Sequence, residues 1–165
     1  MIKAQRGKNE IIQDQLVEVK LRFLRYLEEI PEKYWEWKPN KKDWTIKQEM
    51  VHILQVLQVI PAGIIRATTG KKRSLLSIIP ASLRSWINGN ILIPLKAKQQ
   101  TRTTIADQYN TAHNVLVELI FTLSEADFEK GMPFPKKYRT VEQMALRPVE
   151  HFIEHEEHLK SILSS

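Results

Sequence analysis

The chain contains no cysteine among its 165 residues. This absence excludes disulfides, thiolate metal ligands and cysteine nucleophiles together. Any metal site must therefore use histidine, carboxylate or water ligands. The absence of disulfides also fits a reducing compartment.

Long apolar runs are missing as well. No run approaches the roughly 20 apolar residues that a membrane-spanning helix needs. Residues 1–8 are charged and lack the apolar centre of a secretory signal peptide. We expect a soluble, cytoplasmic protein that has no membrane partner.

Acidic residues are absent from residues 50–106, although the whole chain has 19 of them. The formal net charge is +6, and all of the excess positive charge lies in this segment. Such a patch can meet an anionic small molecule, nucleic acid or lipid, but a solvated basic surface is the commoner explanation. No helix shows a basic stripe with a motif that reads bases, so we expect no nucleic-acid partner. The segment contains eight basic residues: Arg66, Lys71, Lys72, Arg73, Arg84, Lys96, Lys98 and Arg102.

The composition is that of a globular protein, with 42% hydrophobic and 27% charged residues. A chain of this length can bury a core without disulfides or a structural metal. We expect residues 1–165 to form a single domain.

Hydrophobic periodicity predicts four long amphipathic helices and no convincing strand. Apolar residues recur three or four positions apart over residues 9–30 and again over residues 101–123. Thr45 with Gln48, and Thr140 with Gln143, have the spacing of capping boxes and predict the starts of the second and last helices. Gly70 predicts the end of the second helix. The fold class that follows is all-α, a four-helix bundle.

Residues 71–100 join the second and third helices and have the least regular pattern. Pro80, Gly89 and Pro94 interrupt apolar runs here. We expect a short helix over residues 81–86 within a long, otherwise irregular crossover. Its apolar residues can cover the open end of the bundle or form a subunit contact.

Four aromatic residues lie close together between the first and second helices. Aromatic side chains in such a loop usually fold back onto the core, and this interpretation is favoured over a platform that stacks bases. The four residues are Tyr34, Trp35, Trp37 and Trp44.

Three of the five histidines lie in residues 147–162. His151 and His155 are four residues apart, so on a helix they share one face and can chelate one divalent ion. His158 lies near the same face. The neighbouring Glu150, Glu154 and Glu157 are expected in solvent. The alternative is an ordinary solvated helix face, because this histidine spacing also occurs by chance.

The other two histidines have less informative surroundings. His52 lies on a largely apolar face, where a histidine is either a buried, hydrogen-bonded residue or a ligand. His113 lies at the edge of an apolar stripe and is expected to be structural or to face solvent.

Two stretches resemble the DinB/YfiT-like superfamily. Residues 44–54 are similar to the start of helix two in that superfamily. There a tryptophan lies eight positions before a histidine, and the serine or threonine after it lies seven positions before. Residues 139–144 and 148–155 resemble its last helix, which carries two histidines four apart. The first stretch reads Trp44-Thr45-Ile46-Lys47-Gln48-Glu49-Met50-Val51-His52-Ile53-Leu54, and the end of the second reads Pro148-Val149-Glu150-His151-Phe152-Ile153-Glu154-His155.

The resemblance implies a three-histidine site for zinc or nickel formed by His52, His151 and His155. Water or substrate would complete the shell, and three protein ligands with an open position are typical of catalytic zinc. His158 is an alternative partner for His155. Glu49, one turn before His52, is a candidate to hydrogen-bond a metal ligand without itself binding the metal.

The resemblance also implies a small-molecule substrate and a possible homodimer. The expected function is a metal-dependent thiol S-transferase, acting with a low-molecular-weight thiol, or a hydrolase. Carboxylates of the thiol would then need basic partners. The alternative is a non-catalytic, stress-associated bundle that binds metal or an apolar ligand, or acts through dimerisation. Candidates for the basic partners are Arg66, Arg84, Lys96 and Arg102.

Overall fold

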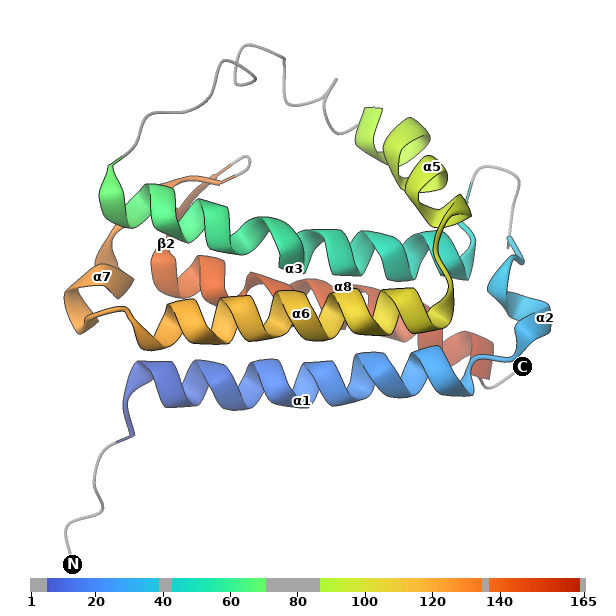
Figure 1. Cartoon of the computed structure of the whole chain (residues 1–165), viewed down its shortest axis with the longest axis horizontal. Coiled ribbons are helices and arrows are strands. Elements are labelled where there is room, and N and C mark those ends of the chain that lie inside the picture. The colour runs from blue at the N-terminus through green and yellow to red at the C-terminus, as the bar shows by residue number, and fades with distance from the viewer. Residues whose placement is uncertain (1–5, 39–42, 71–86, 135–136, 164–165) are drawn as a thin grey trace, which may run out of the picture.

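A computed structural model describes residues 6–38, 43–70, 87–134 and 137–163. Its four long helices lie along one direction, which confirms the predicted all-α four-helix bundle (Figure 1). They are α1 (Lys8–Glu29), α3 (Ile46–Thr69), α6 (Arg102–Phe121) and α8 (Val141–Leu163). The shorter elements are α2 (Glu32–Trp35), η2 (Asn88–Leu92), α5 (Ile93–Lys98), α7 (Glu125–Glu129), β1 (Gly131–Pro133) and β2 (Tyr138–Thr140).

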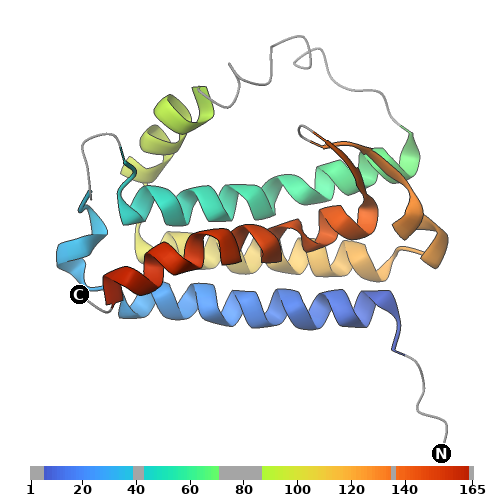
Figure 2. The same ribbon diagram turned by 180° about the vertical axis from the view of Figure 1, so that it is seen from behind.

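The four long helices enclose one core. Helix α3 packs against α6 and α8, and α1 packs against the same two helices. Seen from behind, α8 lies between α3 and α1 (Figure 2). One face of α8 is therefore turned towards α3 and another towards α1.

Local sequence signals set the helix boundaries. The hydroxyl of Thr45 accepts a hydrogen bond from the backbone N–H of Gln48 at 3.2 Å, and the side-chain oxygen of Gln48 accepts one from the backbone N–H of Thr45 at 3.0 Å. Thr140 and Gln143 make the same reciprocal pair at 3.2 and 3.1 Å. Gly70, with φ of 66°, ends α3 in the left-handed conformation that glycine adopts readily. The predicted starts of α3 and α8 and the end of α3 are confirmed.

An aromatic cluster occupies the centre of the core. The rings of Phe23 and Tyr109 stack with centroids 4.0 Å apart, and Phe152 meets the edge of Phe23 at 6.4 Å. Helices α1, α6 and α8 each contribute one of these rings. The apolar stripes therefore face inward, as the periodicity predicts.

The aromatic residues before α3 only partly join this core. Trp35 is 5% exposed and packs in the core, whereas Trp37 is 44% exposed. Tyr34 and Trp44 are half-buried against the core. The predicted aromatic lid is confirmed for Trp35 and wrong for Trp37.

The crossover between α3 and α6 is more regular than predicted. Residues 81–86 lie outside the described residues, but residues 88–98 form the π-helical turn η2 followed by α5. Pro94 falls in the first turn of α5, where an amide hydrogen is not needed, so it does not interrupt the helix. Ile93 and Ala97 are buried in the core, while Leu95 is exposed. The expectation of irregular structure is wrong for this part.

A short hairpin precedes α8. Strands β1 and β2 are antiparallel, with Gly131 opposite Thr140. A Cβ at Gly131 would lie 2.5 Å from the carbonyl oxygen of Arg139, so this position requires glycine. The hairpin corrects the expectation of a structure without strands. Its second strand, β2, leads directly into the first residue of α8.

Helix α3 is apolar and long enough to span a membrane by length and composition, with a mean hydropathy of 1.5 in its most apolar window. A helix that contributes much of a protein's core meets the same criteria. Met50, Leu57 and Ile60 of α3 are fully buried between the other helices. The composition of α3 is therefore weak support for a membrane span.

Candidate metal centre

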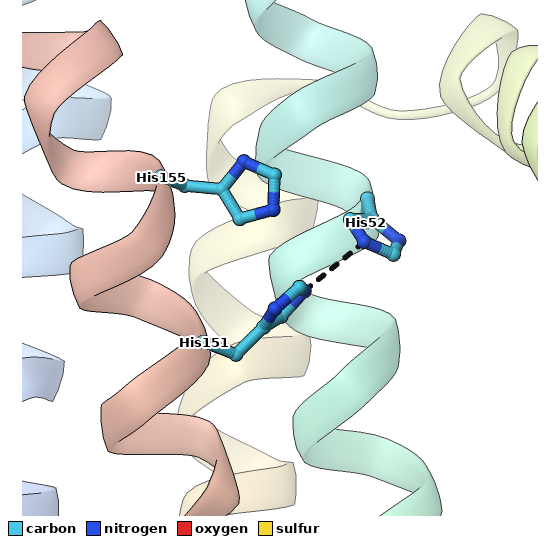
Figure 3. Close-up of side chains that lie close together, drawn as sticks. All are labelled: His52, His151 and His155. Atoms are coloured by element: carbon cyan, nitrogen blue, oxygen red, sulfur yellow. Dashed lines mark hydrogen bonds between the residues drawn. The ribbon is translucent and has the colours of Figure 1, made fainter. Parts of the chain in front are cut away.

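His52, His151 and His155 meet where α3 packs against α8. His52 lies in the second turn of α3, and the other two lie one turn apart on α8. Their ring centroids are 4.7 to 5.4 Å apart, and one nitrogen from each ring lies within 4.8 Å of the others. Figure 3 shows the three rings turned towards one another. The structure thus brings together the three histidines that the family resemblance implied.

The closest contact in this cluster is 3.0 Å, between Nε2 of His52 and Nε2 of His151. A hydrogen bond between two imidazoles requires that one nitrogen carries a proton and the other does not. Two nitrogens that bind one tetrahedral zinc ion at about 2.0–2.1 Å lie roughly 3.3 Å apart. The spacing of this one pair is therefore within a few tenths of an ångström of that of two ligands to the same ion, whereas the three nitrogens together span up to 4.8 Å, and larger side-chain shifts would bring all three onto one ion.

The outer nitrogens of the two α8 histidines are held by carboxylates. Nδ1 of His155 lies 2.7 Å from Glu49, and Nδ1 of His151 lies 3.1 Å from Glu154. A carboxylate accepts the Nδ1 proton and leaves the lone pair on Nε2. Most histidines that bind metals are oriented in this way. Glu49, expected to support a ligand near His52, is thus bonded to His155 in the structure.

The surroundings of His52 are different. Its Nδ1 is buried and has no hydrogen-bond partner in the part of the chain that the structure describes. The edge of the Trp44 ring packs against the imidazole, with centroids 4.7 Å apart. The Trp44 indole also donates a hydrogen bond to the carbonyl of Gly89 at 3.1 Å. Trp44 therefore connects the cluster to η2.

The remaining two histidines lie outside the cluster. Nδ1 of His158 is 2.7 Å from Glu49, so this carboxylate bridges His155 and His158 with its two oxygens. His113 is buried in α6, where burial lowers its pKa, and its Nδ1 is 3.4 Å from Asn114. The structural interpretation of His113 is confirmed.

Arg147 was not identified from the sequence, although it anchors one side of the site. Its guanidinium makes two hydrogen bonds to Glu154, at 2.7 and 2.8 Å, and lies 3.1 Å from Nδ1 of His151. Arg147, His151 and Glu154 follow at positions i, i+4 and i+7, which share one helix face. That spacing was the available signal for the network. Glu154 is exposed, as expected, and it also pairs with Arg147 and His151.

Electrostatics keeps two of the imidazoles neutral. Burial lowers the pKa of His52 to about 3, and the adjacent His151 and His155 add to the shift. Burial also lowers the pKa of His151, against the opposing effect of Glu154. The hydrogen bonds from Arg147 lower the pKa of Glu154 to about 2, so it is ionised. Neutral imidazole is the form that binds a metal ion.

Two recesses open beside the cluster. The larger has a volume of about 430 Å³ and is lined by Asp43, Trp44, Glu49, His155 and His158. The smaller has a volume of about 150 Å³ and is lined by His52, Gln55, Val56, Val59 and Asn88. A small molecule can thus approach the cluster from either the His155 side or the His52 side.

Two of the four basic side chains expected to hold substrate carboxylates lie away from the cluster. Arg66 donates to the carbonyl of Ala62, about four turns along α3 from His52. Arg102 donates to Leu27 at the end of α1 and stacks on the Trp35 ring at 4.3 Å. The prediction that Arg66 and Arg102 serve the site is wrong, because each guanidinium is used by a nearby helix carbonyl. Arg84 lies outside the described residues.

Comparison with known proteins gives a family. The sequence model of the DinB superfamily matches residues 15–159. The chain belongs to the DinB superfamily. The match covers all four long helices in whole or in large part and confirms the resemblance seen in residues 44–54 and 148–155. No curated protein sequence matches significantly.

Solved structures show the same DinB fold. YfiT from Bacillus subtilis, described as a probable metal-dependent hydrolase with an unusual four-helix bundle topology, has a TM-score of 0.73 at 16% identity. That match covers 98% of this chain and 89% of YfiT. A DinB-like protein, YjoA from Bacillus subtilis, has a TM-score of 0.61 at 14% identity, covering 93% and 89% of the two chains. At these identities the likeness establishes the fold alone.

Proposed function

We propose that His52, His151 and His155 bind one divalent metal ion through Nε2, and that the protein uses it to hydrolyse a small molecule. The observation that carries this proposal is the convergence of three imidazoles from α3 and α8, two of them backed by carboxylates. A metal bound here would lower the pKa of a bound water and supply a nucleophile near neutral pH.

The donor set suits zinc or nickel. Imidazole nitrogen is a good ligand for both ions, and three protein ligands leave a position open. In the tautomer that carries the proton on Nδ1, His155 and His151 donate to Glu49 and Glu154, and both Nε2 lone pairs are directed into the cluster. Arg147 in turn fixes Glu154, and Trp44 covers one edge of His52.

Hydrolysis is proposed ahead of thiol transfer for two reasons. YfiT, which shares the fold, is described as a probable metal-dependent hydrolase. Transfer from a carboxylate-bearing thiol would need counter-charges, and Arg66 and Arg102 are engaged away from the site. The alternative is a non-catalytic bundle, which would bind the metal ion but turn over no substrate.

Metal analysis tests the site. Untagged wild type and His151→Ala would be incubated with zinc or nickel, desalted and analysed by ICP-MS, with Glu157→Gln on the same helix as a matched control. We expect about one equivalent in wild type and in the control, and almost none in His151→Ala. Absence of metal from wild type after both incubations would contradict the proposal.

A substrate screen then tests the reaction. Loaded wild type and His151→Ala would be assayed on panels of esters, amides and lactones, each with and without added thiols. We expect metal-dependent hydrolysis that needs no thiol. Turnover only in the presence of a thiol would favour S-transfer, and metal binding without any turnover would favour the non-catalytic alternative.

A further inference from the structure

Trp44 contacts both the histidine cluster and η2. It directly precedes Thr45, the N-cap of α3. Its indole meets the imidazole of His52 at a steep angle, with ring centroids 4.7 Å apart and planes at 64°. Its indole N–H donates a hydrogen bond to the carbonyl oxygen of Gly89 at 3.1 Å. One side chain thus joins a proposed metal ligand to a segment 45 residues further along the chain.

The imidazole of His52 has different neighbours from those of the other two histidines in the cluster. His151 and His155 each have a carboxylate beside Nδ1, at 3.1 and 2.7 Å. In the described part of the chain, the rings that contact His52 are those of His151, His155 and Trp44. Trp44 is therefore the aromatic neighbour of His52 that is not itself a proposed ligand. Outer contacts that fix a ligand side chain contribute strongly to metal affinity.

The indole of Trp44 is held by packing as well as by its hydrogen bond. Its side chain is half-buried against the hydrophobic core. A Cβ at Gly89 would lie 3.4 Å from Cζ2 of Trp44, so the glycine lets the backbone of η2 approach the indole closely. The core, η2 and His52 thus all contact this ring. Its position therefore depends on η2 as well as on the core.

Segment η2 lies at the surface of the bundle. None of its five residues is buried, whereas α5, which follows it, is anchored by two buried side chains. The amide of Gln55 donates a hydrogen bond to the Asn88 side chain at 2.9 Å. Trp44 supplies a second bond, to the carbonyl of Gly89. Segments with little buried surface open locally at a low cost in free energy. The bond from Trp44 therefore stabilises the docked position of η2.

We propose that Trp44 is a positioning residue that orients His52 towards the metal ion and links metal binding to the docking of η2. When His52 is held by a metal ion, its imidazole restricts the indole that bonds to Gly89. Docked η2 restricts the same indole from another side. Linkage is reciprocal, so whatever docked η2 adds to the metal affinity, the bound metal adds to the docking of η2. The inference rests on the proposed metal site, and short π-helical segments occur often at functional sites.

The cobalt affinity of matched tryptophan variants tests the positioning role. Trp44→Ala removes both contacts, and Trp44→Phe keeps a ring beside His52 without the N–H, which carries the test if Trp44→Ala does not fold. Trp37→Ala is the control, because Trp37 is 44% exposed and outside the core. Competition with a coloured chelator gives each dissociation constant per folded molecule. We expect cobalt to bind about tenfold more weakly to Trp44→Ala, about threefold more weakly to Trp44→Phe, and as in wild type to Trp37→Ala. Equal dissociation constants in the Trp44 and Trp37 variants would overturn the positioning role, whereas failure of wild type to bind cobalt would overturn the proposed function itself.

Hydrogen–deuterium exchange tests the link to η2 without an activity assay. Exchange of residues 88–92 would be measured with and without cobalt, with α7 as the internal reference because it lies at the other end of the bundle from α5 (Figure 1). We expect cobalt to slow the exchange of η2 about fivefold in wild type and to have little effect on it in Trp44→Phe. Exchange that is faster in Trp44→Phe by the same factor with and without cobalt would show a merely structural contact and overturn the link. Cobalt binding with unchanged exchange of η2 in wild type would overturn it as well.

Discussion

Two buried carboxylates lie at the two interfaces of α8, Glu156 where α8 packs against α1 and Glu49 where it packs against α3. They have different hydrogen-bond partners. Glu156 faces α1, is 4% exposed at its side chain and is paired with the guanidinium of Arg22. Glu49 of α3 faces α8, is 7% exposed and is bonded to His155 and His158. The adjacent α8 residues His155 and Glu156 thus contact different helices, α3 and α1 respectively.

The difference lies in the partners. Arg22 always carries a charge, so the α1–α8 pair is fixed and structural. Burial raises the pKa of Glu156, but the bonds from Arg22 and Lys160 outweigh it and lower the pKa overall. Imidazoles can be neutral and still donate to Glu49, which leaves their second nitrogens available. Under the proposed function, the Glu156 side of α8 therefore serves stability and the Glu49 side serves metal binding.

The largest expected effect is on stability. Replacing Arg22 by Met leaves Glu156 buried with weaker compensation from Lys160, and we expect a loss of about 3 kcal/mol in the free energy of unfolding. Urea denaturation measures this loss. Metal content per folded molecule should not change. A stable variant that loses its metal would contradict the division between the two sides of α8.

The next effect is on metal affinity. Glu49→Gln keeps the shape but weakens the acceptor for Nδ1 of His155, and we expect the metal to bind about 10- to 100-fold more weakly. Competition with a coloured chelator measures this affinity. Glu157→Gln is the control, since Glu157 is exposed on the same helix as His155. Equal affinities in the two variants would contradict the role of Glu49.

A third effect concerns the pH dependence of the metal-free protein. The pKa of His52 is about 3 in the folded protein and near 6.5 when unfolded, so the unfolded chain binds more protons between these values. The contribution of His52 to the free energy of unfolding is therefore fully present above about pH 6.5, and it should be lost as the pH is lowered through this window. Thermal melts between pH 7 and 5 isolate the effect from most carboxylates. His52→Leu should melt with a shallower pH dependence, and an equal slope would contradict this assignment.

The smallest effect is expected from Arg147. Arg147→Met removes the partner that fixes Glu154 but leaves the Glu154 bond to His151, so metal affinity should fall only a few-fold. The same chelator competition applies. A loss larger than that of Glu49→Gln would show that Arg147, rather than the carboxylates, organises the cluster.

Local features of the fold were predictable because their causes are local. The threonine–glutamine capping boxes at Thr45 and Thr140 and the glycine at position 70 act within one helical turn, and each sets a boundary as predicted. The segment containing Pro94 was misinterpreted because proline usually interrupts a helix but is readily accommodated in its first turn, where no amide hydrogen is needed. Its position relative to the start of α5 was not apparent from the sequence.

The site was less predictable because its contacts cross between helices. The spacing of His151 and His155 indicates a shared face, but only the family resemblance linked them to His52, 99 residues away. The contact of Glu49 with both His155 and His158 depends on how α3 and α8 pack. The Gln55–Asn88 pair depends on where η2 docks, for which the sequence carried no signal.

The most direct test of the central claim is a crystal structure of the zinc-loaded protein, with anomalous scattering recorded at the zinc edge. The account predicts a single anomalous peak about 2.0–2.1 Å from Nε2 of His52, His151 and His155, with Glu49 still bonded to His155. A peak bound by Glu49 and His158 instead, or no peak within the three-histidine cluster, would contradict it.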